Sequence, residues 1–154
     1  MSRQPPVQLR AGHRLLTVLR QILAAAAPQE GCALLLGQRC GDGWRLDWVW
    51  PCCNVWPVPD ERCRHFAIDP REQLLAQKWG RQRGLEVFGS AHSHPTSEAV
   101  PSASDCRLSA LPALMVILGA GSHHQERDQE RALVGWWIPE PPAQPQRLPW
   151  TMES

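Results

Sequence analysis

The stretch His-Ser-His-Pro-Thr-Ser-Glu-Ala-Val-Pro-Ser-Ala-Ser-Asp, residues 92–105, holds most of the information about the fold of this 154-residue chain. It directly follows an apolar, strand-like segment at residues 85–91. Because side chains alternate between the two faces of a strand, His92 and His94 are expected to point to the same side. Pro95 cannot donate to a ladder of backbone hydrogen bonds, so the strand is expected to end there. The sequence therefore predicts two imidazoles side by side at a strand end.

A carboxylate follows at a spacing that suits the same site. After a short loop that ends at Pro101, a helix is expected to begin at Ser102 as N-cap, because a serine hydroxyl can accept a hydrogen bond from the first turn. Asp105 then lies on the same side of that turn and can reach back toward His92 and His94. Two imidazoles, one carboxylate and an open fourth position are typical of catalytic zinc, whereas structural zinc has four protein ligands. The sequence predicts a metal site at these three residues.

This spacing resembles the signature of the JAMM family of metalloproteases, the catalytically competent MPN domains, which is His-x-His-Pro, six residues, Ser, two residues, Asp. Every fixed position is matched between residues 92 and 105. The likeness extends from residues 30–37, Glu-Gly-Cys-Ala-Leu-Leu-Leu-Gly, to the apolar segment 133–138. Residues 66–70, Phe-Ala-Ile-Asp-Pro, look like the short bacterial members of the family.

The resemblance implies a role for two further residues. The family's general base is a glutamate that takes a proton from the zinc-bound water and passes it to the leaving amine, and it falls on Glu30. Glu98 is closer to the histidines in sequence, but only Glu30 matches the family. The family's serine, which hydrogen-bonds the tetrahedral intermediate, falls on Ser102. The resemblance thus implies a zinc metallopeptidase or isopeptidase with one Zn²⁺ per chain, which hydrolyses an amide bond at the C-terminal tail of a ubiquitin-like or sulfur-carrier protein or in a peptide.

Other function classes were weighed against this interpretation. Family members that lack the ligands act as non-catalytic MPN scaffolds, but this chain keeps the ligands. A nucleobase deaminase needs His-x-Glu together with Pro-Cys-x-x-Cys, and residues 51–53, Pro-Cys-Cys, lack that spacing. Two histidines and a carboxylate can also hold ferrous iron, which ligand type alone does not exclude. The peptidase hypothesis remains the favoured one, with zinc or iron to be decided by metal analysis.

Hydrophobic periodicity predicts a single α/β domain, and the resemblance adds a mixed, curved sheet flanked by helices. Amphipathic helices are expected over residues 10–26 and 70–83, the second with Asp69 as N-cap. Apolar segments between turn residues predict strands, at residues 31–37, 44–50, 85–91, 114–118 and 133–138. Residues 119–131 are expected to form a polar loop. The predicted metallopeptidase domain spans residues 1–138, and residues 139–154, with five prolines, are expected to be an extended or disordered tail.

Composition limits the kinds of binding partner and the cellular compartment that are expected for this protein. Sixteen basic against fifteen acidic side chains, without a run of like charge, argue against nucleic acid. No apolar stretch reaches the length of about 18 residues that a membrane helix needs. Arg20 and Gln21 interrupt the leucine-rich N-terminal stretch, so it is interpreted as a core helix and not a signal peptide. The six cysteines form no Cys-x-x-Cys pair, which favours free thiols, although a Cys32–Cys40 or Cys52–Cys63 bridge stays possible. A cytoplasmic protein is expected.

Overall fold

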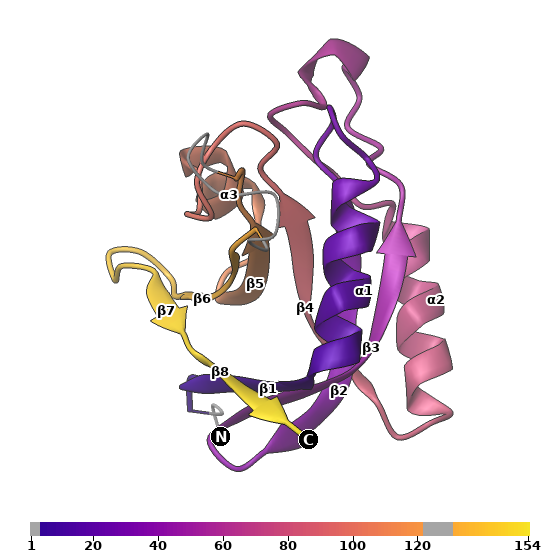
Figure 1. Ribbon diagram of the computed structural model, residues 1–154, viewed down its shortest axis with the longest axis vertical. Coiled ribbons are helices and arrows are strands. Elements are labelled where there is room, and N and C mark those ends of the chain that lie inside the picture. Colours follow the sequence, from indigo (N-terminus) through magenta and orange to yellow (C-terminus); the bar gives the residue numbers. More distant parts are fainter. Residues whose placement is uncertain (1–3, 122–130) are drawn as a thin grey trace.

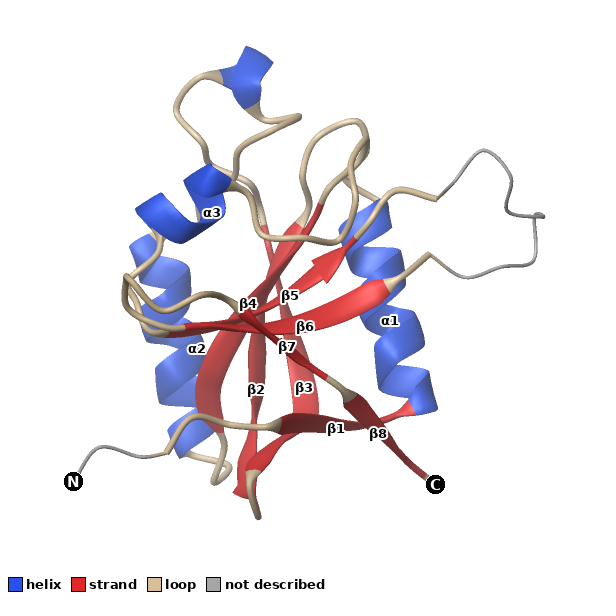
Figure 2. Cartoon of the chain, turned by 90° about the vertical axis from the view of Figure 1, so that its left-hand side faces the viewer, coloured by secondary structure: helices blue, strands red, loops and turns tan. Residues whose placement is uncertain are grey.

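An eight-stranded mixed sheet lies at the centre of the computed structural model, which describes residues 4–121 and 131–154 (Figure 1). Helix α1 (His13–Ala24) covers one face of the sheet, and helices α2 (Pro70–Arg81) and α3 (Ala103–Leu108) cover the other, as Figure 2 shows. The strands are β1 (Gln8–Gly12), β2 (Cys32–Cys40), β3 (Gly43–Cys52), β4 (Glu86–Ser93), β5 (Ala113–Leu118), β6 (Leu133–Ile138), β7 (Gln146–Leu148) and β8 (Trp150–Glu153). Their order across the sheet is β7-β6-β5-β4-β2-β3-β1-β8. The predicted α/β class, a mixed sheet flanked by helices, is confirmed.

The face of the sheet toward α1 holds the main apolar core. Leu16, Leu19 and Leu23 recur at helical spacing along α1 and are buried. They belong to one cluster with Leu35 of β2 and Ala91 of β4, both fully buried. This face is therefore closed to solvent, and any site on the sheet has to lie on the opposite face.

The first helix begins later than the sequence predicts. Residues 8–12 form β1, which runs parallel to both β3 and β8. The helix then extends only from His13 to Ala24. The partners of β1 come from distant parts of the chain, so the periodicity of the local sequence does not reveal this strand.

Helix α2 follows the prediction. The Asp69 side chain caps it by accepting a hydrogen bond of 2.9 Å from the backbone N–H of Arg71, and Pro70 occupies the first turn. Gly84, just beyond the helix, has φ of +70°, a left-handed conformation that glycine adopts at little cost. Ala76 packs the helix against β2, in one apolar cluster with Leu36.

The strands predicted at residues 31–37 and 44–50 form a hairpin, and both are longer than expected. Strands β2 and β3 are antiparallel, and their turn contains Gly41 with φ of +59°. On its other edge β2 pairs antiparallel with β4, with Cys32 opposite His92. The start of β2 and the end of β4 are therefore neighbours, which places residue 30 beside the histidines.

The proline-rich tail is extended, but it is not free of the sheet. Strand β7 pairs antiparallel with β6 at one edge, and β8 pairs parallel with β1 at the other. Pro149 lies between β7 and β8, and its carbonyl accepts a hydrogen bond of 2.9 Å from Leu9 N–H. Proline is tolerated at sheet edges because one side of an edge strand needs no donors. The tail thus forms both edges of the sheet, a role that its composition did not indicate.

The remaining expectations concern thiols, membranes and one loop. All six cysteines are free, so neither of the two considered bridges is formed. Burial raises the pKa of the Cys32 and Cys52 thiols to about 12, which favours their protonated form. No helix in the described part of the chain is long and apolar enough to cross a membrane. Of the predicted loop at 119–131, residues 122–130 lie outside the described residues.

Candidate metal centre

The two predicted histidine ligands lie together on the face of β4 that is turned away from α1. His92 is fully buried and His94 is 5% exposed, and their Nε2 atoms are 3.1 Å apart. Ser93 points the opposite way, where its hydroxyl accepts a hydrogen bond of 2.8 Å from Gly31 N–H and donates one of 3.4 Å to the Leu23 carbonyl. The alternation expected of a strand therefore holds. It puts the imidazoles on one side and a structural hydroxyl on the other.

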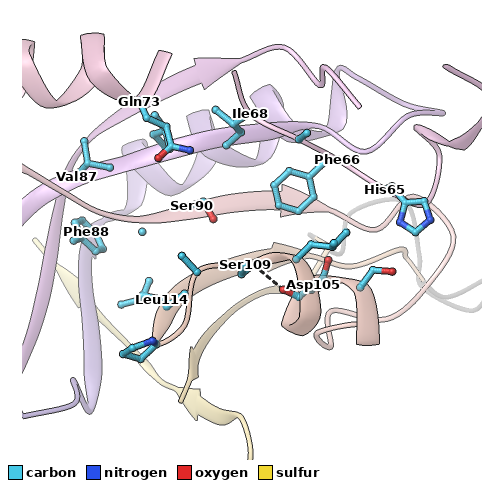
Figure 3. A pocket seen from close by; sticks show the side chains of 18 of the residues that line it. His65, Phe66, Ile68, Gln73, Val87, Phe88, Ser90, Asp105, Ser109 and Leu114 are labelled. Atoms are coloured by element: carbon cyan, nitrogen blue, oxygen red, sulfur yellow. Dashed lines mark hydrogen bonds between the residues drawn. The ribbon is translucent and has the colours of Figure 1, made fainter. Parts of the chain in front are cut away.

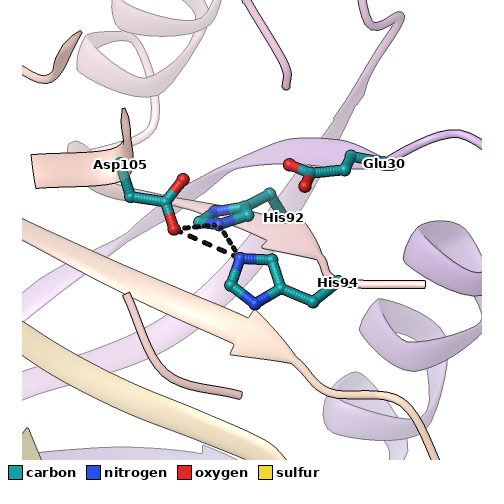
Figure 4. Close-up of side chains that lie close together, drawn as sticks. All are labelled: Glu30, His92, His94 and Asp105. Carbon is teal, nitrogen blue, oxygen red and sulfur yellow. Dashed lines mark hydrogen bonds and ion pairs between the residues drawn. The ribbon is translucent and has the colours of Figure 1, made fainter. Parts of the chain in front are cut away.

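Asp105 joins the histidines from the first turn of α3. Its Oδ2 lies 3.1 Å from His92 Nε2 and 3.2 Å from His94 Nε2 (Figure 4). Ser102 is the N-cap, as predicted, and it forms a capping box that fixes this carboxylate. Ser102 N–H donates to Asp105 Oδ2 at 2.8 Å, and Asp105 N–H donates to Ser102 Oγ at 3.0 Å. The N-cap of a six-residue helix thus positions the third predicted ligand.

Glu30 approaches the same point from the loop before β2, as Figure 4 shows. It is 4% exposed, and one ligand atom from each of Glu30, His92, His94 and Asp105 lies within 4.8 Å of the others. The next residue, Gly31, packs so tightly on α1 that an added Cβ would overlap the Leu23 carbonyl oxygen. Glycine at this position lets the Glu30 loop lie close against the helix.

Asn54 holds this loop in place, and the sequence analysis did not identify it. Its side-chain amide donates to the carbonyls of Glu30 at 3.0 Å and His65 at 2.9 Å. Its Oδ1 accepts from the backbone N–H groups of Trp56 at 3.1 Å and Ala67 at 3.2 Å. One amide therefore ties the Glu30 loop to the segment over the metal site. An asparagine in a proline-punctuated loop carries no spacing signal that would have revealed this.

The electrostatics of the four residues differ according to what each one faces. Burial raises the pKa of Glu30 to about 7, partly offset by His94 and reinforced by Asp105. Burial also opposes ionisation of Asp105, but its hydrogen bonds with His92 and His94 outweigh this and hold its pKa well below the usual range. Burial lowers the pKa of His92. At His94 burial acts in the same direction, but the bonds to Asp105 and to the Glu98 carbonyl raise the pKa overall.

The donor set fits a cation. His94 Nδ1 lies 2.7 Å from the Glu98 carbonyl oxygen, which can only accept, so this nitrogen carries the proton. In a neutral His94 the Nε2 atom then presents a lone pair toward the Asp105 carboxylate. Glu30 Oε1 is buried and has no hydrogen-bond partner among the described residues. Several electron pairs thus converge on one point, an arrangement that a divalent metal ion satisfies.

Two aromatic stacks form a wall over this centre. The Phe66 ring lies on the imidazole of His92, with centroids 4.4 Å apart and planes inclined by 20°. The neighbouring His65 stacks on Trp56, with centroids 4.6 Å apart. None of these three wall residues belongs to the sequence motif. Their role follows from the fold of the loop at residues 53–69 and was not predicted from the sequence.

A groove of about 610 Å³ leads away from the centre (Figure 3). It begins at Asp105, His65 and Phe66 and extends between α2 and the segment after α3, with Ser90 of β4 in its floor. It opens because β5 pairs with β4 only from Ser90 to Ser93, whereas β2 pairs with β4 as far back as Glu86. Of the four residues of the centre, Asp105 is the one that lines this groove, so the groove reaches the centre at the Asp105 carboxylate.

Comparisons with known proteins place the chain in a family. A family model described as prokaryotic homologs of the JAB domain matches residues 12–136. A probable TtuB-protein conjugate cleaving protease of Thermus thermophilus is 33% identical over 105 residues, covering 68% of this chain and 66%, just under two thirds, of the relative. A desampylase of Haloferax volcanii is 28% identical over 104 residues, covering 68% of this chain and 71% of the relative.

Solved structures agree with this placement. The solution structure of a Desulfitobacterium hafniense protein is similar with a TM-score of 0.81 and 28% identity, covering 96% of this chain and 94% of that one. A Salinibacter ruber protein is similar with a TM-score of 0.67 and 28% identity, covering 94% and 92%. The family match spans most of the chain, including residue 30 and residues 92–105. The chain therefore belongs to the prokaryotic homologues of the JAB domain, the JAMM family that its histidine segment resembles.

Proposed function

We propose that this protein is a zinc-dependent isopeptidase, with one Zn²⁺ per chain held by His92, His94 and Asp105. The observation that carries the proposal is the convergence of these three residues and Glu30 within 4.8 Å in a buried position at the end of a groove. The proposed substrate is a conjugate of a ubiquitin-like or sulfur-carrier protein, cut at its C-terminal tail. The names of the Thermus and Haloferax relatives support this substrate class.

A zinc ion in this position would act as a Lewis acid on the amide carbonyl and make water a competent nucleophile near neutral pH. Residues of the chain would then transfer the protons and stabilise the negative charge that develops on the carbonyl oxygen. Glu30, with a pKa of about 7, can take a proton from the attacking water and release it to the leaving amine at neutral pH. Its Oε1 has no other partner among the described residues, so the carboxylate is available for this exchange.

Ser102 has a hydroxyl proton to give to the reacting carbonyl. In the capping box its Oγ accepts from Asp105 N–H, so the bond that fixes the helix uses a lone pair and not the O–H group. The O–H group can therefore donate to the oxygen on which negative charge develops. One serine thus serves as N-cap and as oxyanion donor in this proposal.

The test is hydrolysis of purified conjugates, together with metal analysis of protein expressed without metal supplementation. We expect close to one zinc per chain, and iron in its place would contradict the zinc assignment. Glu30→Gln keeps the shape of the side chain and should lower the rate about 10²- to 10⁴-fold while metal content stays the same. Glu98→Gln is the matched control, because Glu98 contacts His94 through its backbone carbonyl only. If the metal-loaded wild type cleaves no conjugate of any ubiquitin-like protein tested, the proposal is wrong.

A further inference from the structure

The loop at residues 95–101 reaches back to one of the proposed metal ligands. It connects His94, just after β4, with Ser102, the N-cap of α3. Within it, the Glu98 carbonyl oxygen lies 2.7 Å from His94 Nδ1 and also accepts a hydrogen bond of 2.8 Å from the Val100 N–H. In Figure 4 one ring nitrogen of His94 points toward the other ligands and the second points away from them. The Glu98 carbonyl therefore holds the ring from the side opposite to the metal site.

A bond of this kind matters for metal binding. An imidazole that binds a metal through one nitrogen commonly donates its other N–H group to a carbonyl or a carboxylate. That bond fixes the orientation of the ring and makes the coordinating nitrogen more basic. Loops are in general more mobile than the strands that they follow. The orientation of His94 thus depends on what holds the Glu98 carbonyl in place.

Trp136 of β6 holds the loop at the next residue. Its indole Nε1–H donates a hydrogen bond of 2.9 Å to the Ala99 carbonyl, from a position 37 residues away in the sequence. Ala99 is 8% exposed and belongs to a small apolar cluster with Met115 and Ile117, against which the Trp136 side chain packs. Strand β6 is paired on both sides, with β5 and with β7. The indole is therefore a donor on a rigid part of the sheet.

The segment just after β5 supports the same part of the loop. A Cβ added at Gly119 would overlap the Ala99 backbone nitrogen, so the absence of a side chain at Gly119 lets the loop lie this close. The next residue, Ala120, donates a hydrogen bond of 2.8 Å from its N–H to the Ser97 carbonyl. Contacts on both sides of Glu98 in the sequence therefore fix the loop against the sheet.

We propose that Trp136 is a positioning residue of the metal site. By holding Ala99 it keeps the Glu98 carbonyl at His94 Nδ1, and this keeps the His94 Nε2 lone pair directed at the metal position. The inference rests on the proposed function for the identity of the metal. Its effect passes through the loop, so Trp136 acts on a ligand without binding the ion itself.

The experiment measures zinc affinity and the His94 ring, without a substrate. Trp136→Phe removes the N–H group and keeps an aromatic ring. It should raise the Kd for Zn²⁺, measured by competition with a chelator, about threefold to tenfold, which is less than the loss of about 10- to 100-fold expected when a direct partner of a ligand is removed. The His94 Nδ1 proton, followed by NMR in histidine-labelled protein and identified by its absence in His94→Ala, should exchange with solvent at least about threefold faster.

Trp150→Phe is the matched control. The Trp150 indole also donates a hydrogen bond of 2.9 Å to a backbone carbonyl, that of Leu133 in the core on the α1 side. Its removal should lower the stability of the fold to a similar extent as Trp136→Phe. It should change neither the Kd for Zn²⁺ nor the exchange rate of the His94 proton. A general loss of stability would affect both tryptophan variants alike.

A second variant disturbs the loop and leaves the indole intact. Gly119→Ala places a Cβ where Ala99 lies, so it should raise the Kd for Zn²⁺ and the exchange rate of the His94 proton in the same direction. Gly12→Ala is its control, because a Cβ added at Gly12 meets no atom within 4 Å. If Trp136→Phe does not fold, this pair decides the question.

An unchanged Kd or an unchanged exchange rate in Trp136→Phe would overturn the inference, as would equal changes in Trp150→Phe. These outcomes are distinct from failure of the proposed function. If the wild type cleaves conjugates and the variants bind zinc as it does, the function stands and the inference is wrong. If the wild type binds no zinc, the proposed function is wrong, and the exchange rate of the His94 proton in metal-free protein still decides whether Trp136 positions the loop.

Discussion

Near its end, strand β4 buries two adjacent residues of opposite chemistry on its two faces. Ala91 and His92 are adjacent and both have no exposed surface. Ala91 faces the leucines of α1, where burial of apolar area stabilises the fold by about 25 cal/mol per Å². His92 faces Asp105 and Phe66, where burial of polar groups costs free energy unless a partner compensates. We infer that the apolar face of β4 toward α1 supplies stability that offsets the cost of burying the polar groups on the opposite face.

Two consecutive leucines of β2 test this division most strongly. Leu35 is fully buried in the α1 core, and Leu35→Ala should lower the free energy of unfolding by about 2–5 kcal/mol, as leucine truncations in cores do. Leu34 lies on the other face and lines the groove, so Leu34→Ala leaves space that opens to the groove and should cost toward the lower end of that range. Urea unfolding of the two metal-free variants and of the metal-free wild type measures both losses in unfolding free energy. Equal losses, or a larger loss for Leu34→Ala, would contradict the division.

On the metal face, stability should depend on the bound ion. A ligand present at about a hundred times its Kd stabilises the folded state by about 2.7 kcal/mol. The wild type should gain that much with Zn²⁺ over chelator, measured by urea unfolding. His94→Ala removes one of the three proposed ligands and should reduce the gain to near zero at the same Zn²⁺ concentration. An undiminished gain would show that the ion binds elsewhere. Leu35→Ala, by contrast, should keep the full gain.

The sequence predicts the metal face better than it predicts the edges of the sheet. The two-residue spacing of His92 and His94 and the capping box of Ser102 and Asp105 are local rules, and local rules can be read from a short segment. Strands β1 and β8 pair with each other from opposite ends of the chain, so no window of sequence indicates them. Strand β7 pairs with the preceding strand β6, but it is only three residues long and lies among prolines. The proline count in residues 139–154 argues against a central strand, and the two strands that this segment forms, β7 and β8, do occupy the edges.

The residues that hold the metal site in place could not be predicted from the sequence, for a related reason. Asn54, Trp56 and His65 come from a loop without hydrophobic period or motif. Phe66 begins a segment that resembles the family, but that resemblance did not predict that its ring stacks on His92. Their roles arise from which backbone groups and rings the fold brings beside them. The groove along α2 lies where β5 does not yet pair with β4, before Ser90, and this arrangement is not visible in any short segment of sequence. The proposed metal-ligating residues can thus be recognised from a short segment of sequence. The groove that reaches them depends on how distant strands pair.

The titration of Glu30 makes the stability of the metal-binding face depend on pH. Its pKa of about 7 in the fold lies above the ordinary value of 4.5, so the folded state holds a proton that the unfolded state releases between these values. This contribution to stability is complete below pH 4.5 and is lost as the pH rises through 7. Glutamine does not titrate, so the stability of Glu30→Gln relative to wild type should rise over that window, by on the order of 2 kcal/mol in metal-free protein. A difference that is constant with pH would contradict the assignment.

Ser102 gives the smallest effect, because it supports one short helix at the border of the metal face. Ser102→Ala removes the acceptor for Asp105 N–H and should lower the free energy of unfolding of the metal-free protein by about 1 kcal/mol. Ser102→Thr keeps a hydroxyl at the N-cap and should restore most of it. Urea unfolding of the three proteins decides the matter. A loss as large as that of Leu35→Ala would mean that α3 is part of the stabilising core, and the division between the two faces of β4 would fail there. If the loss is small, the capping box chiefly aims the Asp105 carboxylate at His92 and His94, and the fold does not depend on it.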